Sequence, residues 1–245
     1  MHEVKRAIIV AAGIGKRMLP LTYEIPKPLV KVNGIRMIDT VIEALRVNGI
    51  KEIHVVVGYL KEQFYDWMRF KRDIDIIENP YYDISNNISS LYVAREHLED
   101  CIILDGDQII FNKTILDPHF ERSGYNAVWC EDETEEWLME VEDGIVKSCS
   151  RTGGSKGWQL YSISRWTAED GKKLCKHIEE EFENGNRQIY WDDVVMFCHF
   201  NEYKLGIYKM KKEDIIEIDN LEELISIDRN YEKYRITTPD TEENK

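Results

Sequence analysis

A loop near the start of the chain contains the residue types that bind phosphate. Residues 7–22 read AIIVAAGIGKRMLPLT, so an apolar run leads directly into Gly13, Gly15, Lys16 and Arg17. Glycines let a backbone turn its N–H groups towards an anion, and the two basic side chains add charged hydrogen bonds to phosphate oxygens. The spacing matches neither the G-x-G-x-x-G dinucleotide motif nor a P-loop. The loop therefore predicts a phosphate site of another kind.

One lysine follows ten residues after Arg17, between two prolines. The segment is Pro26-Lys27-Pro28-Leu29. A proline fixes its own backbone dihedral and restricts the residue before it, so the chain on both sides of Lys27 is stiff. Taken alone, Lys27 would be an ordinary exposed loop lysine. Next to a phosphate-binding loop, we interpret it as a side chain that is held in place for chemistry.

Two carboxylates follow a central apolar run. The sequence CIILDGD, residues 101–107, places Asp105 and Asp107 where a buried strand would end. Open α/β sheets bind ligands at the carboxyl ends of their strands, and carboxylate oxygens suit a magnesium ion. The alternative is an ordinary polar transition from strand to loop. We expect a ligand site with a magnesium ion here.

These residues need a sheet to position them, and the first half of the chain predicts one. Short apolar runs (AIIVAA, IHVVVG, IDIIEN, CIILDGD) alternate with amphipathic stretches, which is typical of βαβ units and a mostly parallel sheet. Residues 37–45 repeat apolar side chains at helical spacing, and Asn48-Gly49 then ends the helix. The fold class is therefore α/β.

The second half of the chain differs in pattern. Residues 125–165 are β-rich and interrupted by glycines, which predicts a small antiparallel insertion. A helix is expected from about Thr167 to Asn184, and Asn220 followed by Glu223 predicts the cap of a last helix. We expect one domain over residues 1–235 and a frayed polar tail over residues 236–245.

Composition excludes several classes of protein. A net charge of -14 disfavours a nucleic-acid surface, and no apolar run reaches the roughly 20 residues that span a membrane. No signal peptide precedes the first strand, so we expect a cytoplasmic protein. The five cysteines contain no C-x-x-C pair and the six histidines no H-E-x-x-H motif, so neither predicts a disulfide framework or a zinc site.

The motif G-x-G-x-R-x-x-P-L-T followed by P-K-P-L resembles the signature of the sugar-phosphate and choline-phosphate nucleotidyltransferase superfamily, and the resemblance covers nearly the whole chain. It implies a Rossmann-like, mostly parallel mixed sheet flanked by helices, of the nucleotide-diphospho-sugar transferase type. It also implies catalytic roles for Arg17, Lys27 and Asp107.

The same resemblance implies a Mg²⁺ cofactor and a nucleotide site. The metal ligands would be Asp107 and, from the late segment IIEIDN, Asp219. The residues expected to bind the nucleotide are Ala11, Ala12, Gly13, Gly15, Lys16, Arg17, Asn87, Ser90 and Asp105.

Three stretches (NNISSLY, TEEWLMEV and IYWDD) resemble the bacterial choline-phosphate cytidylyltransferases more than the sugar-activating branch. A trimethylammonium group binds aromatic faces through cation–π contacts and needs a carboxylate for its charge. The candidates for this acceptor site are Trp137, Tyr190, Trp191, Asp192 and Glu217. The alternative is that these aromatic residues belong to the core, which is their more frequent place.

The expected reaction transfers CMP from CTP to phosphocholine and releases pyrophosphate, without a covalent intermediate. A phosphate nucleophile is already ionised at neutral pH, so no general base is required. Phosphoethanolamine and 2-aminoethylphosphonate are the nearest alternative acceptors, followed by a sugar 1-phosphate. A module that binds nucleotide without catalysis is the non-enzymatic alternative. The sequence leaves a monomer and a homodimer equally open.

Overall fold

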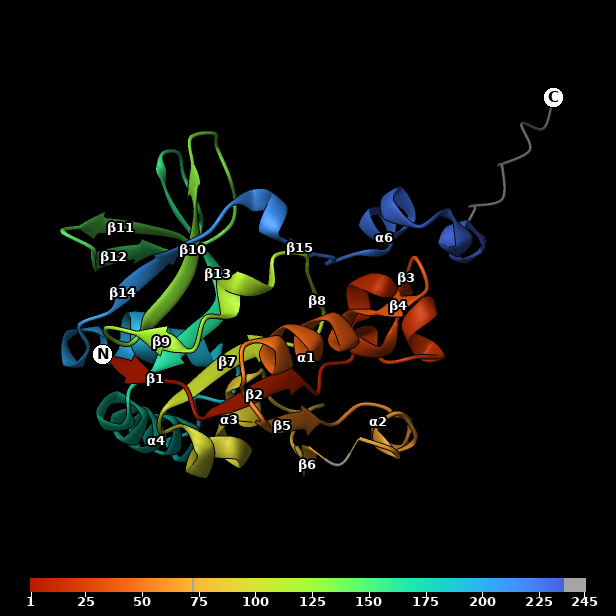
Figure 1. The fold of residues 1–245 in the computed structure, drawn as a ribbon, viewed down its shortest axis with the longest axis horizontal. Helices are drawn as coiled ribbons and strands as arrows, with labels where there is room; N and C mark the ends of the chain where they lie inside the picture. Colours follow the sequence, from red (N-terminus) through yellow and green to blue (C-terminus); the bar gives the residue numbers. More distant parts are fainter. Residues whose placement is uncertain (72, 236–245) are drawn as a thin grey trace.

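The centre of the fold is a parallel sheet. The computed structural model describes residues 1–71 and 73–235. Four parallel strands lie in the order β7 (Cys101–Asp105), β2 (Arg6–Ala11), β5 (Glu52–Val57) and β6 (Ile74–Glu78). Their carboxyl ends therefore meet at one edge, and the loop that follows β2 lies in the middle of that edge (Figure 1).

Helices cover both faces of these strands (Figure 1). Ile9 of β2 packs in one apolar cluster with the first two helices, and Ile8 packs in another cluster with the next two. Successive side chains of a strand point to opposite faces, so both faces of β2 are buried. The helices are α1 (Met37–Val47), α2 (Lys61–Met68), α3 (Ile88–Ala94) and α4 (Ala168–Glu183).

A mostly antiparallel section, in which only the pair of β10 and β14 is parallel, continues the sheet beyond β7 in the described residues. It lies in the predicted β-rich region, but it is joined to the parallel strands through the pairing of β13 with β7 and also takes in a later strand, β14. Because β10 pairs with both β13 and β14, the five strands close into a ring. These strands are β10 (Gly124–Cys130), β11 (Leu138–Glu142), β12 (Ile145–Ser150), β13 (Gly157–Trp166) and β14 (Gly206–Lys209).

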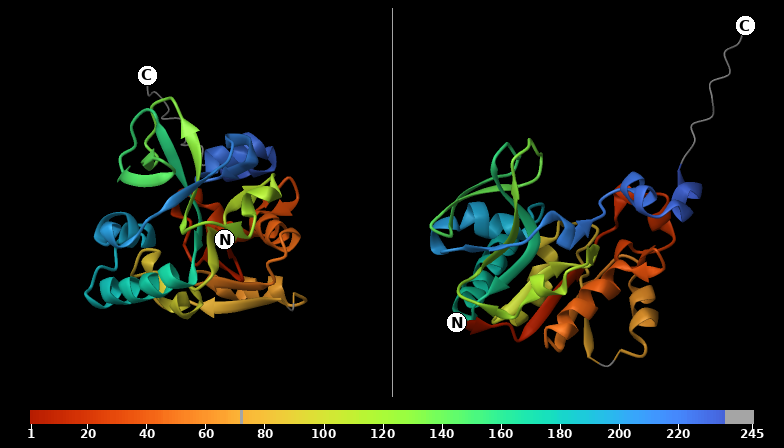
Figure 2. Two further views of the ribbon diagram at one scale, coloured as in Figure 1. Left: turned by 60° about the vertical axis from the view of Figure 1, so that its left-hand side comes forward. Right: turned by 45° about the horizontal axis from the view of Figure 1, so that its top comes forward.

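A short two-stranded sheet brings the late part of the chain to the carboxyl edge of β7. Strand β8 (Gln108–Ile110) pairs antiparallel with β15 (Ile215–Glu217), with Gln108 opposite Glu217. Helix α6 (Leu221–Ile227) follows and packs on the segment after the first loop, through side chains such as Met18 and Leu224. Figure 2 shows α6 beside this N-terminal segment in both views.

The remaining elements are short. They include β1 (His2–Glu3) paired with β9 (His119–Phe120), β3 (Lys31–Val32) paired with β4 (Ile35–Arg36), and α5 (Trp191–Asp193), which continues into a π-helical segment (Val194–Cys198). No helix in the described part of the chain is long and apolar enough to cross a membrane. The tail predicted over residues 236–245 lies outside the described residues.

Two predicted helix starts are confirmed with their caps. The side chain of Thr167 accepts a hydrogen bond from the backbone N–H of Asp170 at 3.1 Å, at the start of α4. The side chain of Asn220 accepts one from the backbone N–H of Glu223 at 3.0 Å, at the start of α6. Both caps satisfy N–H groups that a helix leaves without an internal partner.

Candidate active site

A cleft of about 600 Å³ opens at the carboxyl edge of the parallel strands. Its walls come from the loop after β2, the end of β7, the segment between β6 and α3, and the residues just before α6. Most of the predicted site residues line it: Ala11, Ala12, Gly13, Gly15, Lys16, Arg17, Lys27, Asn87, Ser90, Asp105, Asp107, Tyr190 and Asp219.

The glycine loop folds back onto Lys27. Gly15 has a φ of +68°, and a Cβ there would lie 3.0 Å from the Thr22 side chain and 3.2 Å from Cβ of Lys27. The Thr22 hydroxyl donates a hydrogen bond to the carbonyl of Gly15 at 3.0 Å. Gly13 has open space where a Cβ would stand, so its backbone is accessible from the cleft. Only glycine adopts the positive φ of residue 15 without strain, which explains why a glycine stands there.

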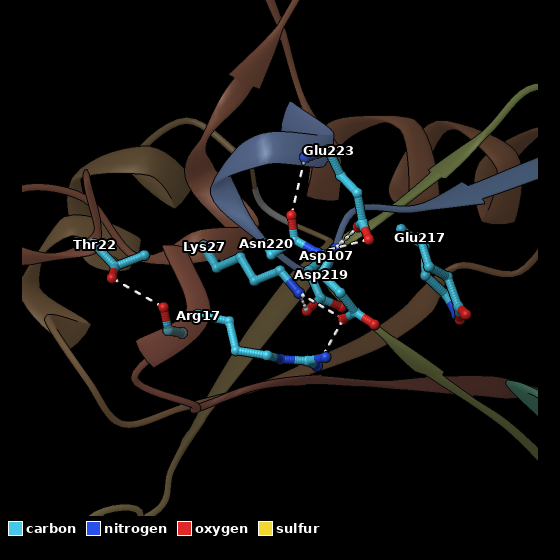
Figure 3. Close-up of polar contacts among 10 residues, drawn as sticks. Arg17, Thr22, Lys27, Asp107, Glu217, Asp219, Asn220 and Glu223 are labelled. Carbon is cyan, nitrogen blue, oxygen red and sulfur yellow. Dashed lines mark hydrogen bonds and ion pairs between the residues drawn. The ribbon is translucent and has the colours of Figure 1, made fainter. Parts of the chain in front are cut away.

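Lys27 joins two carboxylates from distant parts of the chain. Its Nζ lies 2.6 Å from Oδ2 of Asp107 and 3.3 Å from Oδ1 of Asp219. Arg17 Nη2 lies 2.9 Å from the same oxygen of Asp219 (Figure 3). Lys27 is only 7% exposed, whereas the Arg17 side chain is 69% exposed. The structure thus brings the three predicted catalytic residues and the predicted metal ligands into one ion-pair group.

The charges in this group are perturbed by burial and by one another. Burial lowers the pKa of Lys27, but attraction to Asp107 and Asp219 and hydrogen bonds with them outweigh it, so the pKa lies above its usual value. Burial and the neighbouring carboxylates, Asp107 first among them, raise the pKa of Asp105 well above its usual value. The charged form of Lys27 is therefore stabilised, while the charged form of Asp105 is destabilised.

The start of α6 holds Asp219 in place. The backbone N–H of Asp219 donates to Oε2 of Glu223 at 2.7 Å, and the Asn220 side chain donates to Oε1 of Glu223 at 2.7 Å. Figure 3 shows this cap directly behind the ion-pair group, with Glu217 set apart from it. The helix cap and the position of Asp219 are therefore one structural unit.

The predicted acceptor residues separate into two groups. Tyr190 lines the cleft and is 49% exposed, and its ring packs edge-on against Trp137 with the centroids 6.0 Å apart. Trp137 is partly buried and stands behind Tyr190, so it does not line the cleft itself. Glu217 also lies outside the lining, and Gln108 donates to it at 2.7 Å. Burial raises the pKa of Glu217 to about 7.

The prediction that Trp191 and Asp192 line the acceptor site requires correction. Trp191 is 1% exposed, stacks on Tyr125 at 5.9 Å and packs edge-on against Trp166 at 6.1 Å. Asp192 is 6% exposed. The backbone turns into α5 at this point, so the side chain of Tyr190 points to the cleft and its successors point into the core. Adjacent residues at a helix start face different directions.

Several residues of the cleft wall were not predicted. Asn79 donates to Ser89 Oγ at 2.9 Å and to Ser90 Oγ at 3.2 Å, which ties the end of β6 to α3. Its position gave a usable signal, because a polar residue directly after a buried parallel strand lies at the binding edge. Gln188 offered no such signal. The other unpredicted lining residues include Tyr82, Asp83, Ile84 and Ser85.

A second group of possible metal ligands lies at the opposite edge of the sheet. Atoms of Glu52, His54 and His97 lie within 4.8 Å of one another, and the two imidazole rings stack at 3.9 Å. Arg6 Nε, however, lies 3.3 Å from Oε1 of Glu52. The guanidinium already supplies the positive partner of this carboxylate, so we interpret the group as a packed ion pair.

Comparison with known proteins agrees with the resemblance found in the sequence. The family described as MobA-like NTP transferase domain matches residues 7–176. A 2-aminoethylphosphonate cytidylyltransferase of Lancefieldella rimae is 38% identical over 232 residues, 94% of each chain. A choline-phosphate cytidylyltransferase of Streptococcus pneumoniae is 34% identical and covers 89% of this chain and 94% of its own.

A solved structure of a CTP:phosphocholine cytidylyltransferase from Streptococcus pneumoniae has the same fold. It superposes with a TM-score of 0.85 at 33% identity, over 93% of this chain and 99% of that one. The chain belongs to the MobA-like NTP transferase family and is a nucleotidyltransferase.

Proposed function

We propose that this protein transfers CMP from CTP to a small phosphate or phosphonate that carries a cationic amine, and releases pyrophosphate. The observation that carries the proposal is the ion-pair group of Arg17, Lys27, Asp107 and Asp219 in a cleft beside a glycine loop. The names of the similar proteins support cytidine as the nucleoside and an amine-bearing acceptor.

In this proposal the acceptor oxygen attacks the α-phosphorus in line, the bond to pyrophosphate breaks, and no covalent enzyme intermediate forms. Positioning and electrostatic stabilisation then account for catalysis. Gly13, Gly15 and Lys16 bind the triphosphate, while Lys27 and Arg17 exchange their carboxylate partners for phosphate oxygens. Asn87 and Ser90 lie across the cleft and contact the nucleoside.

The residues present suit a magnesium ion. Asp107 and Asp219 come close enough together for both to bind one ammonium group, and carboxylate oxygens are the ligands that Mg²⁺ prefers. These two residues would hold the ion. When bound, it supplies positive charge that neutralises phosphate oxygens during transfer.

Two acceptors follow from the relatives: 2-aminoethylphosphonate and phosphocholine. The sequence favours phosphocholine because of its aromatic residues. In the structure, Tyr190 remains available to an acceptor in the cleft, whereas Trp191 does not. Both acceptors therefore enter the test, together with phosphoethanolamine and a sugar 1-phosphate.

The test is pyrophosphate release with Mg²⁺ in a grid of the four nucleoside triphosphates against these acceptors. We expect a dominant signal for CTP with one amine-bearing acceptor, and its loss in Asp107→Asn. A dominant sugar 1-phosphate would overturn the acceptor class and keep the reaction. Nucleotide binding without pyrophosphate release in any combination would instead favour a catalytically idle module.

A further inference from the structure

Arg151 lies against the aromatic cluster of Trp137, Tyr190 and Phe197. Its Cζ is 4.1 Å from the ring centroid of Phe197 and 5.8 Å from that of Trp137. Trp137 packs edge-on against Phe197 at 5.4 Å and against Tyr190 at 6.0 Å. The guanidinium therefore occupies faces on which an external cation would make its cation–π contacts.

A buried carboxylate holds Arg151 there. Arg151 Nη2 lies 2.5 Å from Oδ1 of Asp193, whose side chain is 4% exposed. The other oxygen of Asp193 accepts a hydrogen bond from the backbone N–H of Tyr190 at 2.8 Å. Arg151 is thus attached to the same turn that presents Tyr190 to the cleft. Its own side chain is 47% exposed, so it has room to move into solvent.

Two kinds of ammonium would meet this arrangement differently. A trimethylammonium group has no N–H donor and relies on aromatic faces. Tyr190 offers it one from the cleft, but the faces of Trp137 and Phe197 become available only when Arg151 leaves them. A primary ammonium has three donors and can bind the carboxylates and carbonyls of the cleft without those faces. Displacing Arg151 also leaves Asp193 as a buried charge without its partner, which is costly.

We infer that Arg151 is an internal cation that determines acceptor specificity, favouring a primary ammonium such as that of 2-aminoethylphosphonate over the quaternary ammonium of phosphocholine. This inference rests on the proposed function. Arg151 acts on the acceptor through the aromatic cluster and takes no part in the transfer step. Tyr190 is the side chain of this cluster that lines the cleft, so the acceptor and the aromatic cluster come into contact through Tyr190.

The first test compares kcat/KM for the two acceptors at saturating CTP and Mg²⁺. In Arg151→Ala we expect the ratio of phosphocholine to 2-aminoethylphosphonate to rise at least tenfold. The double variant Arg151→Ala/Asp193→Asn removes the unpaired buried carboxylate and keeps the test valid if the single variant folds poorly. A ratio that is unchanged or lower in the folded variants would overturn the inference.

Arg95→Ala is the matched control. Arg95 also lies over an aromatic ring, Tyr92, at 4.5 Å, and forms an ion pair with Glu179 at 3.3 Å, but Tyr92 packs on Tyr81 and Phe182 and does not belong to the cluster of Trp137, Tyr190 and Phe197. We expect its acceptor ratio to equal that of the wild type. An equal rise in this control would show that loss of any such arginine changes the ratio, and would overturn the specific role of Arg151.

A second test separates this inference from the proposed function. Choline chloride, which has the quaternary ammonium but no phosphate, is titrated into the protein without nucleotide, and binding is followed by calorimetry. We expect at least tenfold tighter binding in both Arg151 variants than in the wild type. Equal affinities would overturn the inference. If the wild type transfers CMP to no acceptor, the proposed function fails, and this titration still tests whether Arg151 blocks the cluster.

Discussion

Lys27 is a buried cation whose partners are arranged before any substrate binds. A buried charge is tolerated only when it is paired, and Lys27 reaches Asp107 and Asp219 at the same time. The prolines on either side restrict its backbone, and Gly15 lets the loop pack against it. The lysine is therefore held in place at the cleft by the loop, the two prolines and both carboxylates.

We expect Lys27→Met to lower kcat at least about 100-fold, since it removes a positioned charge that stabilises the transition state. The free energy of unfolding should change little, because the side chains of Asp107 and Asp219 are 29% and 36% exposed and stay solvated without the lysine. Pyrophosphate release and urea denaturation measure the two quantities. Lys61→Met, which breaks an ion pair between α2 and Glu78 of β6 outside the cleft, should leave kcat unchanged. Near-normal turnover in Lys27→Met would contradict the assignment.

Asp192 makes stability depend on pH. Burial raises the pKa of Asp192 from 3.8 to about 7. Between these values the folded protein keeps a proton that the unfolded chain releases, so stability falls as pH rises from about 4 to 7 and then levels off. The contribution of Asp192 is therefore most favourable at low pH.

Asp192→Asn should remove this dependence. Relative to the wild type, the free energy of unfolding of the variant should rise by about 4 kcal/mol between pH 4 and pH 8, because each unit of pKa shift is worth about 1.4 kcal/mol. Urea denaturation across this range measures the difference. Asp66→Asn changes an exposed carboxyl on α2 and is the control. A constant difference at all pH values would show that Asp192 ionises normally in the folded state.

At the scale of elements, local signals predicted most of the fold. Helices α1, α4 and α6 were predicted because their apolar spacing and caps lie within a few residues of one another. The parallel strands were predicted because both of their faces are apolar. The glycine loop, Lys27 and Asp107 could be recognised because their residue types and spacing are contained in short segments.

Features set by contacts between distant segments were not predicted. The pairing of β8 with β15 and the closure of the five-stranded ring through β14 join parts of the chain that lie far apart in sequence. The sequence also gave no sign that Tyr190 faces the cleft while Trp191 faces the core, because α5 is too short to show a helical pattern. The contact of Arg151 with the aromatic cluster is likewise visible only in three dimensions.

The cap of α6 should influence both stability and metal use. Asn220→Ala removes the oxygen that accepts the cap hydrogen bond from the backbone N–H of Glu223. We expect this loss to lower the free energy of unfolding by about 1 kcal/mol. Glu223 also binds the backbone N–H of Asp219, so the variant should need several-fold more Mg²⁺ for half-maximal activity. A magnesium titration of pyrophosphate release measures this requirement.

Thr167→Ala is the matched control, because Thr167 caps α4, which lies outside the cleft lining. It should cost a similar amount of stability and leave the magnesium requirement unchanged. An equal shift in both variants would mean that the metal effect is a general result of lower stability, and that the cap of α6 has no particular effect on Asp219.

The whole molecule is acidic, and its substrate is an anion. The net charge is -14, and the cleft itself contains the carboxylates of Asp107 and Asp219. A triphosphate therefore meets local attraction from Arg17 and Lys27 within a repulsive field. Bound magnesium would place positive charge between these carboxylates and the phosphates, so binding of nucleotide should depend strongly on the ion.

We expect CTP with Mg²⁺ to raise the thermal unfolding midpoint by about 5 to 10 °C at a concentration near 100 times Kd, which corresponds to about 2.7 kcal/mol. CTP with EDTA should give a much smaller rise, because the carboxylates then repel the phosphates. Differential scanning fluorimetry measures both, and EDTA should also abolish pyrophosphate release. Asp219→Asn is the informative variant, since it removes one expected metal ligand and should reduce the difference between the two conditions. Equal midpoints with and without Mg²⁺ in the wild type would mean that Asp107 and Asp219 serve only as partners of Lys27 and Arg17.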